Sequence, residues 1–231
     1  MNKKNIYIGF DSKETIASET CEFSIKKNSK KSFTINHLKL LDLKNKDLYF
    51  RDHDKLSSTE FTFTRFLVPY LQNYSGWAIF CDSDFIFLND IDELFSLADD
   101  KYAVMCVQHE YNPNVQKKKL GSEQLLYPRK NWSSLVLWNC SHPSNKVVNL
   151  DLVNSQTGKY LHRFGWLKDQ EIGKISLEWN WLVGWYKEPD DGKPKALHYT
   201  EGGPWLGEEF KNVEYADIWL EYLKNCKDKN S

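Results

Sequence analysis

Apolar residues along the chain form two kinds of segment that differ in their spacing. Short runs rich in β-branched and aromatic residues, bounded by polar or turn-forming residues, predict strands; these runs are Asn5–Phe10, Phe33–Leu38, Trp77–Cys81, Tyr102–Val107, Ser134–Trp138 and Ala196–Tyr199. The segments with helical spacing are Glu14 to about Lys27, the stretch after Ser57, Ser144–Asn154 and the C-terminal Tyr215–Cys226. Because strands and helices alternate, the sequence predicts an α/β fold with a mixed, mostly parallel sheet covered by helices on both faces.

The stretch after Ser57 carries the clearest helix-start signal. Ser57-Ser58-Thr59-Glu60 is a capping box in which Ser57 serves as the N-cap and Glu60 reaches back to it. The apolar stripe that follows consists of Phe63, Phe66, Leu67, Tyr70 and Leu71. This spacing predicts a helix whose apolar face packs on the core.

Two pairs of carboxylates follow the Trp77–Cys81 strand. Asp90 precedes an amphipathic turn, so we interpret it and Asp92 as structural, with Asp90 as a helix N-cap. Asp82 and Asp84 have no such explanation. In extended chain their side chains share one face, where two carboxylates repel each other unless a cation lies between them. The pattern predicts a Mg²⁺ or Mn²⁺ site at the end of a strand, where ligands bind in open α/β sheets.

Composition limits the alternatives. With 31 basic and 32 acidic residues, the 231-residue chain has no net field that would attract nucleic acid, and its length fits one domain spanning 1–231. Aromatic residues make up 15%, with nine Trp, which suits either a Trp-rich core or flat platforms for sugar rings. Five separated cysteines without a CxxC pair favour a reducing compartment. The N-terminal apolar stretch is too short for a signal peptide or membrane span, so we expect a cytoplasmic protein whose contact with membranes is at most peripheral.

Several segments together resemble GT-A-type glycosyltransferases, and most closely the family-8 group of retaining, nucleotide-sugar-dependent enzymes. They occur in the family's order and cover nearly the whole chain: the first strand ending in Asp11, TRFLVP from Thr64, CDSDFIFLNDIDELF from Cys81, NWSSLVLWNC from Asn131, LKDQEIG from Leu167, SLEWNW from Ser176 and HYTEGGPW from His198. The resemblance implies a Rossmann-like GT-A domain that transfers a hexose from a nucleotide sugar, for which we expect a UDP-linked donor. The acceptor would be a glycan, a lipid-linked saccharide or a protein.

The resemblance also implies roles for individual residues. Asp82, Asp84 and His198 would hold the cation, and an imidazole beside carboxylates suits Mn²⁺ better than Mg²⁺. Asp169 and Gln170 match the pair beside the reacting carbon of the donor sugar. The positions that would contact the donor are Ile8, Gly9, Asp11, Arg65, Asp82, Ser83, Asp84, Asn131, Ser133 and Gly202. Of these, Ile8, Gly9 and Asp11 match the uridine edge, Arg65 the phosphates and sugar, and Asn131 and Ser133 the sugar pocket.

Some of these positions also have plainer structural interpretations. His198 could be a core histidine, Arg65 a surface helix arginine and Asp169 a helix N-cap, while we interpret Trp179-Asn180 as packing. The Gln108–Asn131 segment suits either a surface loop or a lid.

The sequence departs from the family pattern at three places. The lysine that contacts the diphosphate in the family is Gly203, so the charge would come from Lys117–Lys119, Lys193 or Lys195, or be absent. The third residue of the family's Asp-Gln-Asp segment is Glu171, and Ser134 replaces a common glycine. Two other functions therefore stay open: a nucleotide-sugar-binding module without turnover, and a haloacid-dehalogenase-like phosphatase in which the first Asp of the pair is the nucleophile.

Overall fold

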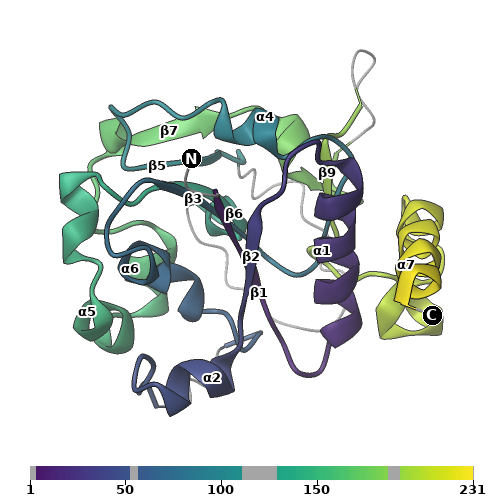
Figure 1. The fold of residues 1–231 in the computed structure, drawn as a ribbon, viewed down its shortest axis with the longest axis horizontal. Helices are drawn as coiled ribbons and strands as arrows, with labels where there is room; N and C mark the ends of the chain where they lie inside the picture. Colours follow the sequence, from purple (N-terminus) through teal and green to yellow (C-terminus); the bar gives the residue numbers. More distant parts are fainter. Residues whose placement is uncertain (1–3, 53–56, 111–128, 187–192, 231) are drawn as a thin grey trace.

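A six-stranded sheet forms the centre of the fold (Figure 1). The computed structural model describes residues 4–52, 57–110, 129–186 and 193–230, so Lys117–Lys119 lie outside the described residues. The strands are β1 (Asn5–Gly9), β2 (Thr34–Leu38), β3 (Trp77–Cys81), β5 (Val104–Val107), β6 (Leu135–Asn139) and β7 (Ile172–Ile175), in the order β2-β1-β3-β6-β5-β7. Only β6 runs antiparallel to its neighbours, β3 and β5. The predicted mixed, mostly parallel sheet is confirmed, although the sequence pattern does not predict β7.

Alternate residues of the strands face two separate cores. On one face, Ile6 and Ile8 of β1 pack with α1 (Thr15–Asn28) and α4 (Asp92–Phe95). On the other face, Tyr7 and Phe80 pack with the helical segments that lie beyond the opposite side of the sheet in Figure 1. These segments are α2 (Leu40–Asn45), the 3₁₀ turn Thr64–Leu67, α3 (Val68–Leu71), α5 (Leu150–Ser155) and α6 (Gly158–His162). Helices therefore cover both faces, as the alternation of strands and helices predicts.

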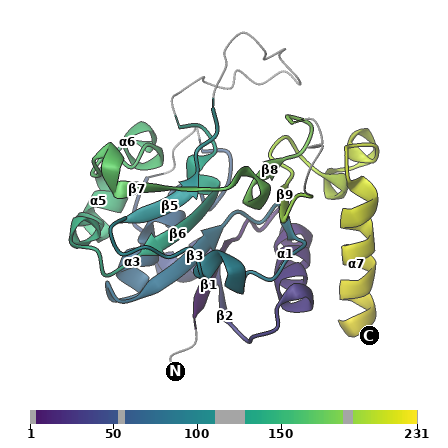
Figure 2. The same ribbon diagram turned by 90° about the horizontal axis from the view of Figure 1, so that it is seen from above.

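A small second sheet places a strand from the last quarter of the sequence next to the C-terminal end of β3. It consists of β4 (Phe85–Phe87), β9 (Ala196–His198) and β8 (Trp181–Leu182), in the order β4-β9-β8. β4 and β9 are antiparallel, and their register pairs Phe85 with His198. Its outer side packs with α7 (Ala216–Asn230), which lies alongside α1 in both views (Figure 2). This sheet is what places His198 beside the Asp82–Asp84 turn.

The predicted helix start at Ser57 is wrong. The helical conformation begins only at Thr64, as a 3₁₀ turn that continues into the four-residue α3. Glu60 does not cap this helix, because its carboxylate accepts hydrogen bonds from the backbone N–H and the hydroxyl of Ser12, at 3.1 and 2.6 Å. A tertiary contact to the loop after β1 thus replaces the local capping box.

The predicted Ser144–Asn154 helix is interrupted. A 3₁₀ turn covers Pro143–Val147, and α5 begins afresh after Asn149, whose side chain accepts the N–H of Leu152 at 2.9 Å. This local cap restarts the helix, because an N-cap side chain satisfies an N–H that would otherwise lack a partner.

The structural interpretation of the second carboxylate pair is confirmed. Asp90 accepts the backbone N–H groups of Asp92 and Lys30, at 3.0 and 3.2 Å. Asp92 forms ion pairs with Lys4 and Lys31, each at 2.6 Å. The helix cap itself falls on Ile91, one residue later than predicted. Both carboxylates thus hold the backbone around the start of α4.

Candidate functional site

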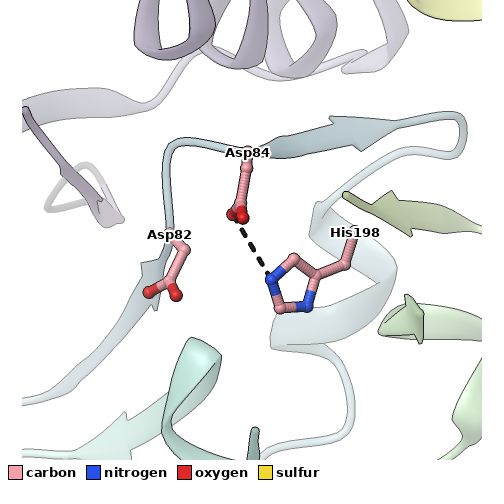
Figure 3. Close-up of side chains that lie close together, drawn as sticks. All are labelled: Asp82, Asp84 and His198. Atoms are coloured by element: carbon pink, nitrogen blue, oxygen red, sulfur yellow. Dashed lines mark ion pairs between the residues drawn. The ribbon is translucent and has the colours of Figure 1, made fainter. Parts of the chain in front are cut away.

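Three side chains from two distant parts of the chain meet where β3 ends (Figure 3). Asp82 and Asp84 flank a tight turn between β3 and β4, and His198 ends β9. The Nε2 atom of His198 lies 3.3 Å from Oδ1 of Asp84, and the imidazole stacks on the Phe85 ring with centroids 4.3 Å apart. One potential ligand atom from each of the three residues lies within 4.8 Å of the others, and this is the only group of three such residues within the described parts of the chain.

The oxygens of this group have the properties of metal ligands. Oδ1 of Asp84 is buried and accepts no hydrogen bond from the described residues, and Oδ1 of Asp82 is buried and faces the Arg65 guanidinium. Burial raises the pKa of the Asp82 carboxyl, the Arg65 guanidinium opposes that rise, and the Asp84 carboxylate adds to it. A divalent cation would coordinate both oxygens, and its attraction for the two carboxylates would offset the repulsion between them. Two carboxylates and one imidazole therefore fit a cation that accepts oxygen and nitrogen ligands.

Asn180 fixes the orientation of the His198 ring. The amide nitrogen of Asn180 donates to the Ser134 hydroxyl at 2.9 Å and faces the Asn131 carbonyl at 3.5 Å, which can only accept. Its Oδ1 therefore points to Nδ1 of His198, 2.8 Å away, and accepts the proton there. This tautomer leaves the lone pair of Nε2 directed at the carboxylates. Asn180 is fully buried, so the interpretation of Trp179-Asn180 as packing holds for Trp179 but misses the role of Asn180.

Replacing Asn180 is expected to weaken metal binding. Asn180→Ala removes the acceptor that holds His198, and loss of such an outer partner typically lowers metal affinity by about 10–100-fold. Titration of Mn²⁺ into the protein measures this. Asn145→Ala is the matched control, because Asn145 is equally buried but bonds the carbonyls of Ala103 and Asn139 instead. Equal Mn²⁺ affinity in Asn180→Ala and wild type would show that Asn180 does not contribute to metal binding.

Arg65 is buried beneath the carboxylates rather than exposed on a helix surface. Its Nη1 lies 2.7 Å from Oδ1 of Asp82 and donates to the Ser133 carbonyl at 3.0 Å. The guanidinium lies between the rings of Phe61 and Phe80, at 5.3 and 5.2 Å from their centroids. With 8% of its side chain exposed, Arg65 positions Asp82, so the interpretation as a surface arginine is wrong.

The predicted uridine edge forms the closely packed end of β1. Ile8 is buried, and a Cβ atom on Gly9 would come within 2.5 Å of the Phe61 ring. The Asp11 carboxylate accepts the backbone N–H groups of Lys13 and Glu60, at 3.0 and 3.2 Å. These contacts fix the loop after β1, and contact with a nucleobase stays a prediction.

Trp205 explains why glycine occupies position 203. A Cβ atom on Gly203 would lie 1.9 Å from the Trp205 ring, so the family's lysine cannot occur there with this ring in place. The Trp205 indole donates to the Glu14 carboxylate at 2.7 Å; burial raises the pKa of Glu14, and the Asp84 carboxylate adds to the rise. The sequence analysis missed both residues. Of the proposed substitutes for the missing charge, Lys195 is already paired with Glu178 at 3.0 Å.

Gly202 has a positive φ of 107°, which favours glycine, and donates its N–H to the Tyr199 carbonyl. It therefore shapes the loop that follows His198.

The segment from Asn131 to Ser134 supports the site from below. Asn131 adopts a left-handed conformation with φ of 62°, and its carbonyl accepts the Ser134 hydroxyl at 2.7 Å. Ser133 is buried, and its hydroxyl lies 2.8 Å from Nδ1 of His162. The hydroxyl at Ser134 that replaces the family's glycine thus contributes to the bonds that hold Asn180.

His162 connects this segment to stability at low pH. Burial lowers the pKa of His162 to about 3, and the nearby Arg65 charge acts in the same direction. The unfolded chain binds a proton at this imidazole below about pH 6.5, whereas the folded protein does not until about pH 3. Stability contributed by the neutral ring is therefore complete above pH 6.5 and decreases as the pH falls.

We expect this single group to lower the free energy of unfolding by about 1.4 kcal/mol per pH unit between these limits. His162→Gln removes the titration, so its stability should differ less between pH 7 and pH 5 than that of the wild type. Urea unfolding of both proteins at the two pH values measures the difference. An identical pH dependence in both would show that His162 does not titrate on unfolding.

The two residues predicted to act on the donor sugar are exposed. Asp169 and Gln170 lie on a 3₁₀ turn, Asp169–Glu171, that precedes β7. The Asp169 side chain is 88% exposed and pairs with Arg129. The N-cap of this turn is Lys168, so the alternative interpretation of Asp169 as an N-cap is wrong. Their place in catalysis stays a prediction.

Comparison with solved structures defines the class of fold. GlyE of Streptococcus pneumoniae TIGR4 superposes with a TM-score of 0.65 at 17% identity, over 96% of this chain and 60% of the GlyE chain. The galactosyltransferase LgtC gives a TM-score of 0.59 at 10% identity, over 96% of this chain and 95% of LgtC. Mouse xyloside xylosyltransferase 1 gives 0.56 at 13% identity, over 87% and 98%. The chain has the GT-A fold of these glycosyltransferases, and it spans about 60% of the length of GlyE.

A curated relative defines the family. Protein CDI of Arabidopsis thaliana is 49% identical over 229 residues, which cover 97% of this chain and 88% of that protein. The chain belongs to the same family as Protein CDI. No protein-family model matches it. None of the helices in the described residues combines the length and apolar character needed to cross a bilayer.

Proposed function

We propose that this protein is a metal-dependent, retaining glycosyltransferase that moves a hexose from a UDP-linked sugar to a glycan, lipid-linked saccharide or protein. One observation carries the proposal: Asp82, Asp84 and His198 converge on one point, where a buried oxygen of Asp84 accepts no hydrogen bond from the described residues. The GT-A fold, shared with the glycosyltransferases named above, supports it. Retention of configuration and the UDP donor rest on the family-8 resemblance of the motifs.

The residues of this chain prepare the site for Mn²⁺, or Mg²⁺, and a diphosphate. Asn180 holds His198 with Nε2 toward the carboxylates, and Arg65 keeps Asp82 in place. When bound, the cation supplies a Lewis acid that neutralises charge on the departing nucleoside diphosphate. Asp169 and Gln170 are proposed to contact the donor sugar, and Ile8, Gly9 and Asp11 its base. The protein is proposed to act in the cytoplasm, with peripheral contact to membranes where the acceptor is lipid-linked.

Hydrolysis of a nucleotide-sugar panel in the presence and absence of Mn²⁺ tests the proposal. A transferase releases nucleoside diphosphate only with the metal. Release of inorganic phosphate would favour the phosphatase alternative, and metal-dependent binding without turnover would favour a binding module. NMR of the first-formed product then gives the anomeric configuration, and an inverted linkage would remove the family-8 assignment.

A further inference from the structure

A cavity lies beside α6, and its lining includes none of the three proposed metal ligands. Its volume is about 380 Å³, which is near the lower end of the range for small-molecule sites. Eight residues line it: Arg129, Thr157, Lys159, Tyr160, Arg163, Phe164, Gly165 and Leu167. Three of them are cationic and none is acidic, so the described lining carries a net positive charge.

Two of these cations have no partner among the residues that the structure describes. The side chains of Lys159 and Arg163 form neither an ion pair nor a hydrogen bond with any described residue, although Lys159 is exposed and Arg163 half-buried. Arg129 differs, because it donates to the Arg163 carbonyl and pairs with Asp169 while it packs over the Trp132 ring. Arg129 is thus held in place, and the other two cations are available to an anion.

The remaining lining residues suit a sugar. The half-buried Tyr160 offers a ring surface, and Thr157 offers a hydroxyl, whereas the fully buried Phe164 packs on Trp138 and Trp166 behind the cavity wall. Flat aromatic surfaces bind apolar faces of sugar rings, while guanidinium groups bind phosphate or carboxylate through paired N–H donors. A cavity of this size accommodates one charged sugar unit rather than a long chain.

The cavity is linked to the candidate active site by short connections. Arg129 lies two residues before Asn131, whose carbonyl faces Asn180. Arg163 follows His162, whose ring lies against the Ser133 hydroxyl. Asp169, which we propose to contact the donor sugar, pairs with Arg129 of the cavity wall. A ligand in the cavity would therefore contact residues that are bonded to, or adjacent in sequence to, those proposed to surround the reacting sugar.

We propose that this cavity binds the phosphate or carboxylate group of an anionic saccharide, which serves as the acceptor. The acceptor role rests on the proposed glycosyltransferase function, whereas binding of the anion does not. Asp169 limits the affinity, because its carboxylate occupies donors of Arg129. Removal of that carboxylate strengthens anion binding.

Calorimetric titration with three probes tests the site at low salt, in protein stripped of metal with EDTA and then dialysed free of the chelator. The probes are glucose 6-phosphate, glucuronate and glucose. We expect saturable binding of at least one charged probe, and none of glucose. The charged probe that binds more tightly assigns the anion as phosphate or carboxylate. Prior removal of metal prevents binding of phosphate through a cation at Asp82 and Asp84, so the result does not depend on whether the protein is a transferase.

Charge-neutralising variants locate the site. Arg163→Gln and Lys159→Gln should each weaken binding about tenfold, the size expected for loss of a charged hydrogen bond. Lys174→Gln, an exposed lysine of β7, changes the net charge equally and should leave affinity unchanged. Asp169→Asn should tighten binding. Because Lys159 is exposed, its variant keeps the fold even where Arg163→Gln does not. Wild-type affinity in Lys159→Gln and Arg163→Gln, or absence of binding by both charged probes, would overturn the proposal.

Discussion

Asp84→Asn is expected to lower metal-dependent hydrolysis of a nucleotide sugar by more than about 100-fold, while the protein stays folded. Outer-shell changes typically cost 10–100-fold in metal affinity, and Asp84 would be a direct ligand. Its Oδ1 is buried without a hydrogen-bond donor and lies 3.3 Å from Nε2 of His198. The amide keeps the shape of the side chain and removes one of two mutually repelling charges, so the melting temperature without metal should not fall.

Asp90→Ala is the matched control for this variant. Asp90 belongs to the neighbouring Asp-x-Asp pair, but it accepts the backbone N–H groups of Asp92 and Lys30. Its replacement should lower the free energy of unfolding by about 1 kcal/mol, which is the typical cost of removing a side chain that accepts a hydrogen bond at the start of a helix. The Mn²⁺ affinity should not change. Calorimetric Mn²⁺ titration and thermal melting of both variants measure the contrast. Loss of metal binding in Asp90→Ala and its survival in Asp84→Asn would reverse the assignment of the two pairs.

Arg65→Met is expected to lower the free energy of unfolding by about 3–5 kcal/mol in metal-free protein. The substitution leaves the Asp82 carboxylate buried without its cation, 2.7 Å from where the guanidinium was. It also removes the donors to the carbonyls of Phe61 and Ser133. Asp82→Ala is expected to destabilise the protein for the reciprocal reason, because it strands the buried guanidinium. Asp84, not Asp82, is therefore the position that tests metal binding without disturbing the fold.

A double-mutant cycle separates the ion pair from general packing. Arg65→Met combined with Asp82→Asn removes both charges, so the double variant should be more stable than the sum of the two losses implies. Added Mn²⁺ should restore part of the stability of Arg65→Met but not of the double variant, because the Asp82 carboxylate is needed to hold the cation. Urea unfolding with EDTA and with Mn²⁺ measures all four proteins. Strict additivity would contradict the pairing of Arg65 with Asp82.

Local sequence was sufficient to predict the limits of elements that consist of an uninterrupted apolar run. The strand Trp77–Cys81 has the predicted limits because five successive apolar residues can be buried on both faces only in a central strand. β7 escaped prediction because its sequence, IGKI, is short and contains a glycine that packs closely on Tyr102 and Met105. The helix start at Ser57 failed because Glu60 has a stronger partner, Ser12, which is distant in sequence.

The candidate site likewise combines features that the sequence predicts with features that only the tertiary structure decides. The spacing of Asp82 and Asp84 after an apolar strand predicted that two carboxylates meet at the end of that strand; they do meet there, but across a turn rather than on one face of extended chain. The resemblance of the motifs then added His198. Only the tertiary structure decided that Phe85 pairs with His198, that Arg65 lies under Asp82, and that Asn180 sets the tautomer of the histidine. Sequence alone places Asp82 beside Asp84 because the two residues are only two positions apart. The contacts of Arg65, Asn180 and His198 join different elements of the fold, so they depend on how those elements pack together.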